Sequence, residues 1–201
     1  PGIFGVVADS YGFGHFIETL PNGQQAVWHG GQGHGWMTHF HIVPEAGKGI
    51  VILTNSQRSW PFLALLLDEW AGRNGFGSVK MGNITTANRI VTALFGLILA
   101  AALWMITRLI LGLIGGGKHF APLTRTGRIG RLLEAAAGIA IIGIVVWRST
   151  LPYIFEASIF PGIIGWGTAV LVFFSIVLIV SALFPRHGAR NSDAYLNSDD
   201  L

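Results

Sequence analysis

The chain of 201 residues contains no cysteine and few charged residues, and both shortages limit what it can be. Without cysteine it has no disulfide, no thiolate metal site and no cysteine nucleophile. Charged side chains make up 11% of the residues, against roughly 25% in soluble domains. Hydrophobic residues make up 51%, and the mean hydropathy is +0.56. This composition indicates a membrane protein rather than one large soluble domain.

Basic residues outnumber acidic ones, but their positions argue against nucleic-acid binding. The formal net charge is +3, and the lysines and arginines cluster beside long apolar blocks, where membrane topology accounts for them. No aromatic-and-basic RNA motif and no helix-turn-helix pattern stands out. We therefore expect the lipid bilayer as a partner, with no nucleic acid and no cofactor, and the sequence leaves the oligomeric state open.

Apolar residues are concentrated in three blocks in the second half of the chain. These blocks run over about residues 90–114, 132–148 and 162–184. Their lengths are close to the roughly 20 residues that a helix needs to cross a bilayer. They predict a transmembrane module over residues 89–185, preceded by a linker at 73–88. The second block is the shortest and carries Glu134, so a buried or interfacial helix is an alternative for it.

Basic residues flank the three blocks unevenly, and this asymmetry predicts their orientation. The basic residues between the first two blocks are Lys118, Arg125, Arg128 and Arg131, and those after the third are Arg186 and Arg190. The positive-inside rule places both regions in the cytoplasm. The N-terminal segment then lies outside the cell membrane, and residues 186–201 form a cytoplasmic tail. Arg108 and Glu134 lie near block ends, where snorkelling toward the headgroups accounts for them better than a functional role does.

The first 72 residues are richer in polar and glycine residues and predict a small soluble segment. Alternating or short apolar runs predict strands at residues 11–18, 24–29, 36–43 and 50–55. Pro21-Asn22-Gly23 and the stretch 44–49 are turn signals. A helix is predicted over residues 60–71, with Ser59 as its N-cap. The fold class is therefore α+β: an antiparallel β-meander with a C-terminal helix, followed by about three transmembrane helices.

The most informative stretch is glycine-rich and runs from Val27 to Trp36 between two predicted strands. Such glycines let a backbone approach a ligand and present N–H groups that can stabilise an oxyanion. With its surroundings, this stretch resembles the C-terminal portion of the serine β-lactamase and penicillin-binding-protein superfamily, in its class C-like branch. The motifs that carry the resemblance are Tyr11-Gly12-Phe13-Gly14, His29-Gly30-Gly31, Gly35-Trp36, Val43-Pro44 and the run Gly49–Ser56. The resemblance covers about residues 9–71 and implies an incomplete β-lactamase-like domain at residues 1–72.

The resemblance also implies roles for individual residues. In that family a Lys/His-Thr/Ser/Gly-Gly box lies on a strand beside the active site. His29 would take its cationic or hydrogen-bonding position, Gly31 its last position, and Gln32 would offer a backbone N–H to the oxyanion hole. Gly30 and Gly33 would contact the substrate. Because Gly30 lacks the hydroxyl group of threonine or serine, an esterase-like or peptidase-like relative is favoured over a true β-lactamase.

The residues that would perform the chemistry are not in this chain. The family's nucleophile lies in a Ser-x-x-Lys motif, and no lysine here has a serine three residues before it. Tyr195-Leu196-Asn197 matches the second motif by letter but follows the apolar blocks, so we interpret it as chance. Because the chain begins with Pro1, we expect a fragment of a membrane-anchored serine hydrolase whose nucleophile lies upstream. The fragment alone should be inactive, and the substrate would be a cell-wall peptide, a β-lactam or another small molecule such as an ester.

Two other functions fit the sequence. One is a non-catalytic membrane protein whose degenerate β-lactamase-like domain binds ligands or signals. The other is a zinc-dependent enzyme, because His15, His29, His34, His39 and His41 are close together in the sequence. His39 and His41 are two residues apart and would share one face of a strand. No carboxylate or cysteine completes a familiar zinc motif, so we predict no metal site.

Overall fold

The structure, a computed structural model, describes residues 5–122, 127–151 and 156–185. These residues fall into two compact units. The first unit comprises Pro1–Leu94 and Tyr153–Trp166, and the second comprises Phe95–Pro152 and Gly167–Leu201. The predicted cytoplasmic tail at 186–201, its Tyr195-Leu196-Asn197 match and the basic residue Arg125 lie outside the described residues.

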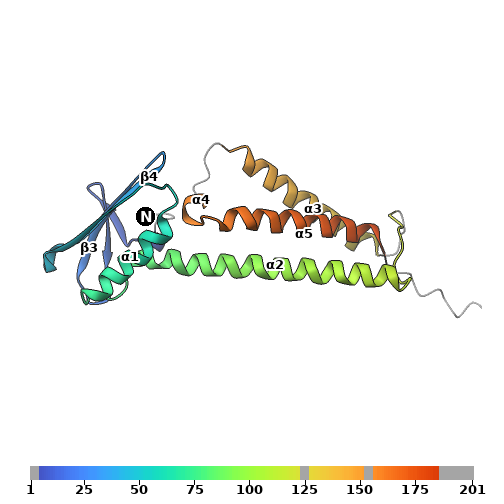
Figure 1. The fold of residues 1–201 in the computed structure, drawn as a ribbon, viewed down its shortest axis with the longest axis horizontal. Helices are drawn as coiled ribbons and strands as arrows, with labels where there is room; N and C mark the ends of the chain where they lie inside the picture. The colour runs from blue at the N-terminus through green and yellow to red at the C-terminus, as the bar shows by residue number, and fades with distance from the viewer. Residues whose placement is uncertain (1–4, 123–126, 152–155, 186–201) are drawn as a thin grey trace, which may run out of the picture. The chain divides into compact units, whose positions relative to one another are not determined.

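The first unit contains a five-stranded antiparallel sheet (Figure 1). Its strands are β1 (Ser10–Gly12), β2 (His15–Thr19), β3 (Gln25–Gly33), β4 (Trp36–Val43) and β5 (Lys48–Thr54). Each strand pairs with the next one along the chain, in the order β1-β2-β3-β4-β5. The predicted antiparallel meander is therefore confirmed, and the predicted strand at 36–43 has the observed bounds.

The single strand predicted at residues 11–18 is wrong, because β1 and β2 form a hairpin there. Phe13 and Gly14 make its two-residue loop, since Gly12 pairs with His15. Both loop residues have positive φ, 50° and 78°. A type I′ turn requires this of its two central residues and matches the twist of the adjoining strands. The alternating pattern misses the turn because a two-residue loop does not interrupt a period of two.

The glycine-rich stretch is mostly strand, because β3 continues to Gly33. Its glycines allow the strand to run beneath the indole of Trp36. A Cβ atom on Gly33 would lie 2.3 Å from that ring, and one on Gly31 would lie 2.6 Å from the hydroxyl oxygen of Thr38. Only His34 and Gly35 remain as the loop between β3 and β4.

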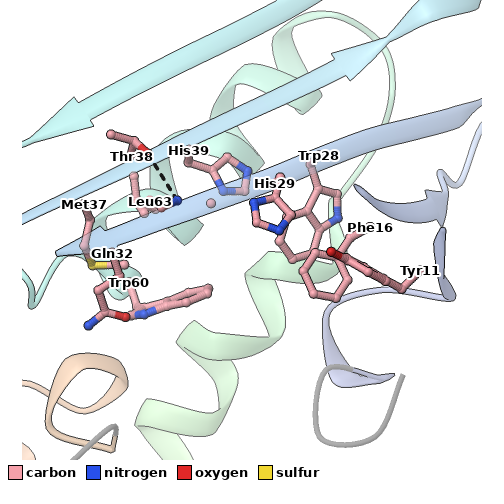
Figure 2. Close-up of a pocket in the computed structure, with 12 residues that line it drawn as sticks. Tyr11, Phe16, Trp28, His29, Gln32, Met37, Thr38, His39, Trp60 and Leu63 are labelled. Atoms are coloured by element: carbon pink, nitrogen blue, oxygen red, sulfur yellow. Dashed lines mark hydrogen bonds between the residues drawn. The ribbon is translucent and has the colours of Figure 1, made fainter. Parts of the chain in front are cut away.

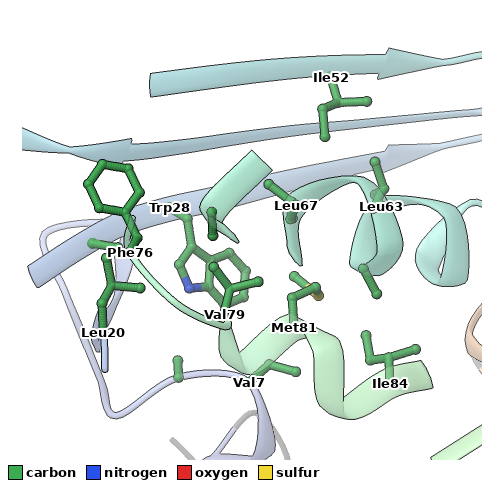
Figure 3. Packing of buried hydrophobic residues seen from close by; sticks show 14 of the residues in the cluster. Val7, Leu20, Trp28, Ile52, Leu63, Leu67, Phe76, Val79, Met81 and Ile84 are labelled. Atoms are coloured by element: carbon green, nitrogen blue, oxygen red, sulfur yellow. The ribbon is translucent and has the colours of Figure 1, made fainter. Parts of the chain in front are cut away.

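Helix α1 (Trp60–Arg73) buries its apolar side in the core of the first unit. Leu63, Ala64, Leu67 and Ala71 are all buried and recur at the spacing of one helix face. They belong to one core cluster with Trp28 and other inward-facing residues of the strands (Figure 3). Ser59 occupies the predicted N-cap position, but its hydroxyl group donates to the carbonyl oxygen of Ser56, at 2.9 Å, and does not cap the helix.

The segment 73–88, predicted as a linker, instead completes the core and begins the next long helix. Phe76, Val79 and Met81 are at most 3% exposed and pack in the same cluster (Figure 3). The backbone N–H of Lys80 donates to the Glu18 carboxyl group at 2.7 Å, which ties this segment to β2. The apolar residues stand singly among glycines and polar residues, so no periodic pattern marks them in the sequence.

Three helices are long and apolar enough to cross a membrane, as the three apolar blocks predict. They are α2 (Asn83–Ile114), α3 (Arg128–Ser149) and α5 (Ile163–Leu183). Only 6% of the apolar window of α3 is buried, so the described residues do not enclose this helix in a core. At 1.5 Å per residue its length is about 33 Å, close to the roughly 30 Å of a bilayer's hydrocarbon layer.

A short helix, α4 (Glu156–Ile159), lies between α3 and α5 in sequence and belongs to the first unit. The side chain of Asn88 donates to the carbonyl oxygen of Ile159 at 3.1 Å. The side chain of Gln32 donates to the hydroxyl group of Ser158 at 3.0 Å. The segment between the second and third apolar helices therefore contacts the sheet domain.

Small residues set the contacts between helices of the second unit. Gly138 of α3 is buried, and a Cβ atom built on it would lie 2.8 Å from both the Ser175 carbonyl oxygen and the Ile179 side chain. A Cβ atom on Gly167 would lie 2.5 Å from the ring of Phe95. Such glycines let helices approach closely, which is how helices associate in membranes.

We expect Gly138→Val to destabilise the second unit, because the added side chain would collide with α5. Overpacking of this kind costs about 1–3 kcal/mol. The measurement is thermal unfolding of the full chain in detergent micelles, followed by circular dichroism. Gly143→Val is the matched control on the same helix, since a Cβ atom there meets no described atom within 4 Å. Equal effects of the two substitutions would contradict the α3–α5 contact.

Candidate functional site

A cavity of about 490 Å³ lies in the first unit along β3 (Figure 2). Four of the five residues predicted as site residues line it: His29, Gly30, Gly31 and Gln32. The fifth, Gly33, is not among its lining residues. The rest of the lining is formed by Tyr11, Phe16, Trp28, Met37, Thr38, His39, Trp60 and Leu63.

The backbone of β3 presents one edge beside this cavity. β2 pairs with β3 only as far as Trp28, so none of the described strands pairs with residues 29–33 on the side opposite β4. The N–H of Gly31 points toward β4, where it donates to the hydroxyl oxygen of Thr38 at 3.1 Å (Figure 2). Successive N–H groups of a strand point to opposite edges. The N–H groups of Gly30 and Gln32 are therefore directed to the edge opposite β4.

Aromatic rings form the wall of the cavity around His29. The ring of Phe16 stacks on Trp28, with centroids 4.4 Å apart, and on His29 at 5.7 Å. Tyr11 meets Phe16 edge-on at 4.7 Å and lies 6.3 Å from the His29 ring. Among the described lining residues there is no lysine, arginine, aspartate or glutamate. The cavity therefore suits an apolar or aromatic group, with His29 as a hydrogen-bonding partner.

Three titratable side chains are buried on the core side of the sheet: Glu18, His39 and His41, each at most 2% exposed. Burial, and to a smaller extent the neighbouring His41 and His29, lowers the pKa of His39 to about 3. Burial also lowers the pKa of His41 to about 4. It raises the pKa of Glu18 to about 7, against the opposing hydrogen bond from Lys80. Glu18 Oε1 and His41 Nε2 lie 3.6 Å apart.

Glu18 is the residue that sequence reasoning missed. It lies on β2 with its side chain almost completely buried, and its carboxyl group accepts the N–H of Lys80. The signal in the sequence is an acidic residue that directly follows Phe16 and Ile17 in a short strand. That signal was hidden because residues 11–18 were interpreted as one strand rather than as two strands joined by a turn.

The histidines are not gathered around one point. His39 and His41 share a buried face of β4, as their spacing predicts, with ring centroids 5.9 Å apart. His34 is exposed in the loop before β4, and His15 packs against Phe40. Within the described residues no three histidine, aspartate or glutamate side chains have an arrangement that could hold a metal ion. The zinc-enzyme alternative therefore gains no structural support.

Comparison of the chain with protein-family models, with curated proteins and with solved structures finds no match. The resemblance to β-lactamase-like hydrolases therefore depends on the motifs between Tyr11 and Ser56. The geometry around β3 adds the positions of these residues relative to the cavity.

Burial of His39 predicts that acid destabilises the first unit. Its pKa is about 3 in the folded chain and 6.5 in the unfolded chain, so the unfolded chain binds more protons between these values. The free energy of unfolding therefore falls as the pH drops below about 6.5, by about 1.4 kcal/mol per pH unit.

Glu18 and His41 change the free energy of unfolding in opposite directions over the same range of pH. The raised pKa of Glu18 makes stability fall as the pH rises from 4.5 to about 7, because the folded chain keeps that proton. The lowered pKa of His41 makes stability rise between about pH 4 and 6.5. Between pH 4.5 and pH 6.5, Glu18 and His41 together hold one proton in the folded chain and one in the unfolded chain, so their two slopes cancel. The remaining slope of stability against pH belongs to His39.

The measurement is chemical unfolding of the full chain in detergent micelles between pH 5 and pH 7, followed by near-ultraviolet circular dichroism. His39→Leu should flatten the pH dependence, whatever its effect on absolute stability. His34→Leu, at the exposed loop position, should retain the slope of the unaltered chain. An undiminished slope in His39→Leu would assign the pH dependence to other groups.

Proposed function

We propose that the first unit is the closing portion of a β-lactamase-like serine hydrolase domain. The three apolar helices α2, α3 and α5 would anchor this domain in the cell membrane, and the nucleophile of the domain would lie upstream of this chain. The observation that supports this most is the cavity along β3, because His29, Gly30, Gly31 and Gln32 all line it. Serine attack would form an acyl-enzyme, which water then hydrolyses.

The direction of the backbone supports the role proposed for Gln32. Its N–H points away from β4, toward the edge of β3 that no described strand covers. A backbone N–H held on a paired strand is a fixed dipole, and fixed donors stabilise the charge that develops on a carbonyl oxygen. His29, whose ring stacks on Phe16, would hydrogen-bond the substrate from the same strand.

The lining of the cavity favours an uncharged substrate. The described lining contains no lysine or arginine to bind a carboxylate, and Gly30 supplies no hydroxyl group. Apolar and aromatic side chains make up most of the remaining wall. An ester or peptide with an apolar group therefore fits better than a β-lactam, which carries a carboxylate.

A three-span topology supports an extracytoplasmic site. The segment containing α4 contacts the sheet domain, so both would lie on one side of the bilayer. The basic residues Lys118, Arg128 and Arg131 belong to the opposite end of the spans, which the positive-inside rule assigns to the cytoplasm. The soluble domain would then face cell-wall peptides and other external substrates.

A second candidate function is ligand binding without catalysis. The observation that favours it is that most of the cavity wall is apolar or aromatic, and the threonine hydroxyl in the lining, that of Thr38, accepts the N–H of Gly31. A degenerate domain of this kind would bind an apolar ligand and pass the signal to the membrane helices.

The proposal is tested by measuring acylation of the protein that is encoded by the complete reading frame containing this chain. We expect this reading frame to encode Ser-x-x-Lys and Tyr-x-Asn motifs upstream, and its product to react with a fluorophosphonate probe. Replacing the serine by alanine should abolish labelling, and the present chain alone should remain unlabelled. An upstream region without these motifs would favour the ligand-binding function.

Two substitutions of Gln32 test its backbone role within that complete protein. Gln32→Pro removes the N–H at a position of β3 beyond the end of its pairing with β2, and proline in a sheet is tolerated at such an edge. We expect its acylation rate to fall by about 10²–10³-fold, the usual effect of losing one oxyanion donor. Gln32→Ala keeps the N–H and removes the contact with Ser158, so its rate should stay close to that of the unaltered protein. Equal losses would assign the effect to the side chain.

A further inference from the structure

A second cavity, of about 420 Å³, lies in the second unit at the ends of its helices. Its polar lining comes from Arg108, Lys118, Arg131, Glu134 and Ser181. We propose that this cavity binds the headgroup of one anionic phospholipid. In the sequence, Arg108 and Glu134 lie near the ends of different apolar blocks, where snorkelling accounts for each of them separately. In the structure both line the same cavity.

The depth of these residues matches a headgroup site. Arg108 is six residues before the end of α2 at Ile114, and Glu134 is six residues after the start of α3 at Arg128. At 1.5 Å per residue, both lie about 9 Å in from the helix ends. Long charged side chains at this depth extend toward the helix ends, and this brings their charged groups to the boundary between headgroups and acyl chains.

The charge and rigidity of the lining favour a phosphate. The described lining carries three cationic side chains, Arg108, Lys118 and Arg131, and one carboxyl group, that of Glu134. The guanidinium group of Arg108 lies over the ring of Trp104, 5.7 Å from its centroid, and this contact restrains it. Guanidinium groups present several donors in a geometry that suits phosphate oxygens. Basic pockets between membrane helices on the cytoplasmic side bind anionic headgroups for the same reason.

Arg131 holds the cavity together from one side. Its guanidinium group donates to the carbonyl oxygens of Ala121, at 3.0 Å, and Ala182, at 3.4 Å. These bonds tie the segment after α2 to the end of α5, so the cavity wall is fixed before a ligand binds. A preformed wall reduces the cost of ordering side chains on binding.

The remaining polar groups suit a hydroxyl-bearing headgroup. The hydroxyl oxygen of Ser181 is buried and has no hydrogen-bond partner among the described residues. Buried polar atoms are normally paired, so this one marks a position where a ligand group can bind. The Glu134 carboxyl group lines the same cavity and can accept a hydroxyl hydrogen. Phe184 and Met105 add apolar surface for the start of an acyl chain. A phosphatidylglycerol headgroup combines these features, and free phosphate shares only the charge.

Native mass spectrometry of the full chain in detergent tests the proposal. The chain would be titrated separately with phosphatidylglycerol, with phosphatidylcholine and with inorganic phosphate. We expect one phosphatidylglycerol per chain, bound at least about tenfold more tightly than phosphatidylcholine, and no displacement by millimolar phosphate. Displacement by phosphate would show a free-anion site instead, and a chain without preference between the lipids would have no headgroup site.

Matched charge deletions separate this cavity from general attraction to an anionic surface. Arg108→Gln should weaken phosphatidylglycerol binding about tenfold. Arg128→Gln removes the same charge at the start of α3, outside the cavity, and should leave binding unchanged. Lys118→Gln is the second variant should Arg108→Gln fail to fold, and it should weaken binding similarly. Equal weakening by Arg128→Gln would overturn the proposal.

Discussion

Burial of Trp28 is the contact on which the first unit depends. Its indole is 1% exposed, belongs to the core cluster with α1 and also forms part of the cavity wall. Phe16 stacks on it and on His29, so the position of the candidate site follows from the packing of the core. Removing a buried tryptophan side chain costs about 3–5 kcal/mol, a large share of the roughly 5–15 kcal/mol that holds a domain folded. Core and site are thus held by the same side chain.

A second constraint is that the sheet cannot complete its core from strands and α1 alone. The segment from Phe76 to Ile84 supplies further buried side chains, and the Glu18 carboxyl group accepts the N–H of Lys80. Because α2 begins at Asn83, the segment that completes this core leads directly into α2 along the chain.

Ionisable side chains occupy different kinds of position in the two units. In the first unit Glu18, His39 and His41 are buried in the core, where desolvation favours their neutral forms. In the second unit the ionisable side chains Arg108 and Glu134 lie near the helix ends and share a cavity. Charge is therefore kept out of the helix centres, where its desolvation would cost most.

The sequence by itself determined the fold class, the meander order and the three apolar helices. Hydrophobic periodicity and segment length are local properties, and they specify elements without any knowledge of distant contacts. The sequence also indicated His29–Gln32 as candidate site residues, because glycines beside a histidine stand out in the sequence itself. Only the tertiary structure decided that Phe13 and Gly14 make a turn, that residues 73–88 join the core, and that Glu18 is buried beside His41. It also decided that Arg108 and Glu134 line one cavity. The turn is hidden in the sequence because a two-residue loop does not interrupt a period of two. The other three features depend on contacts between residues far apart in the chain, and local patterns carry no information about such contacts.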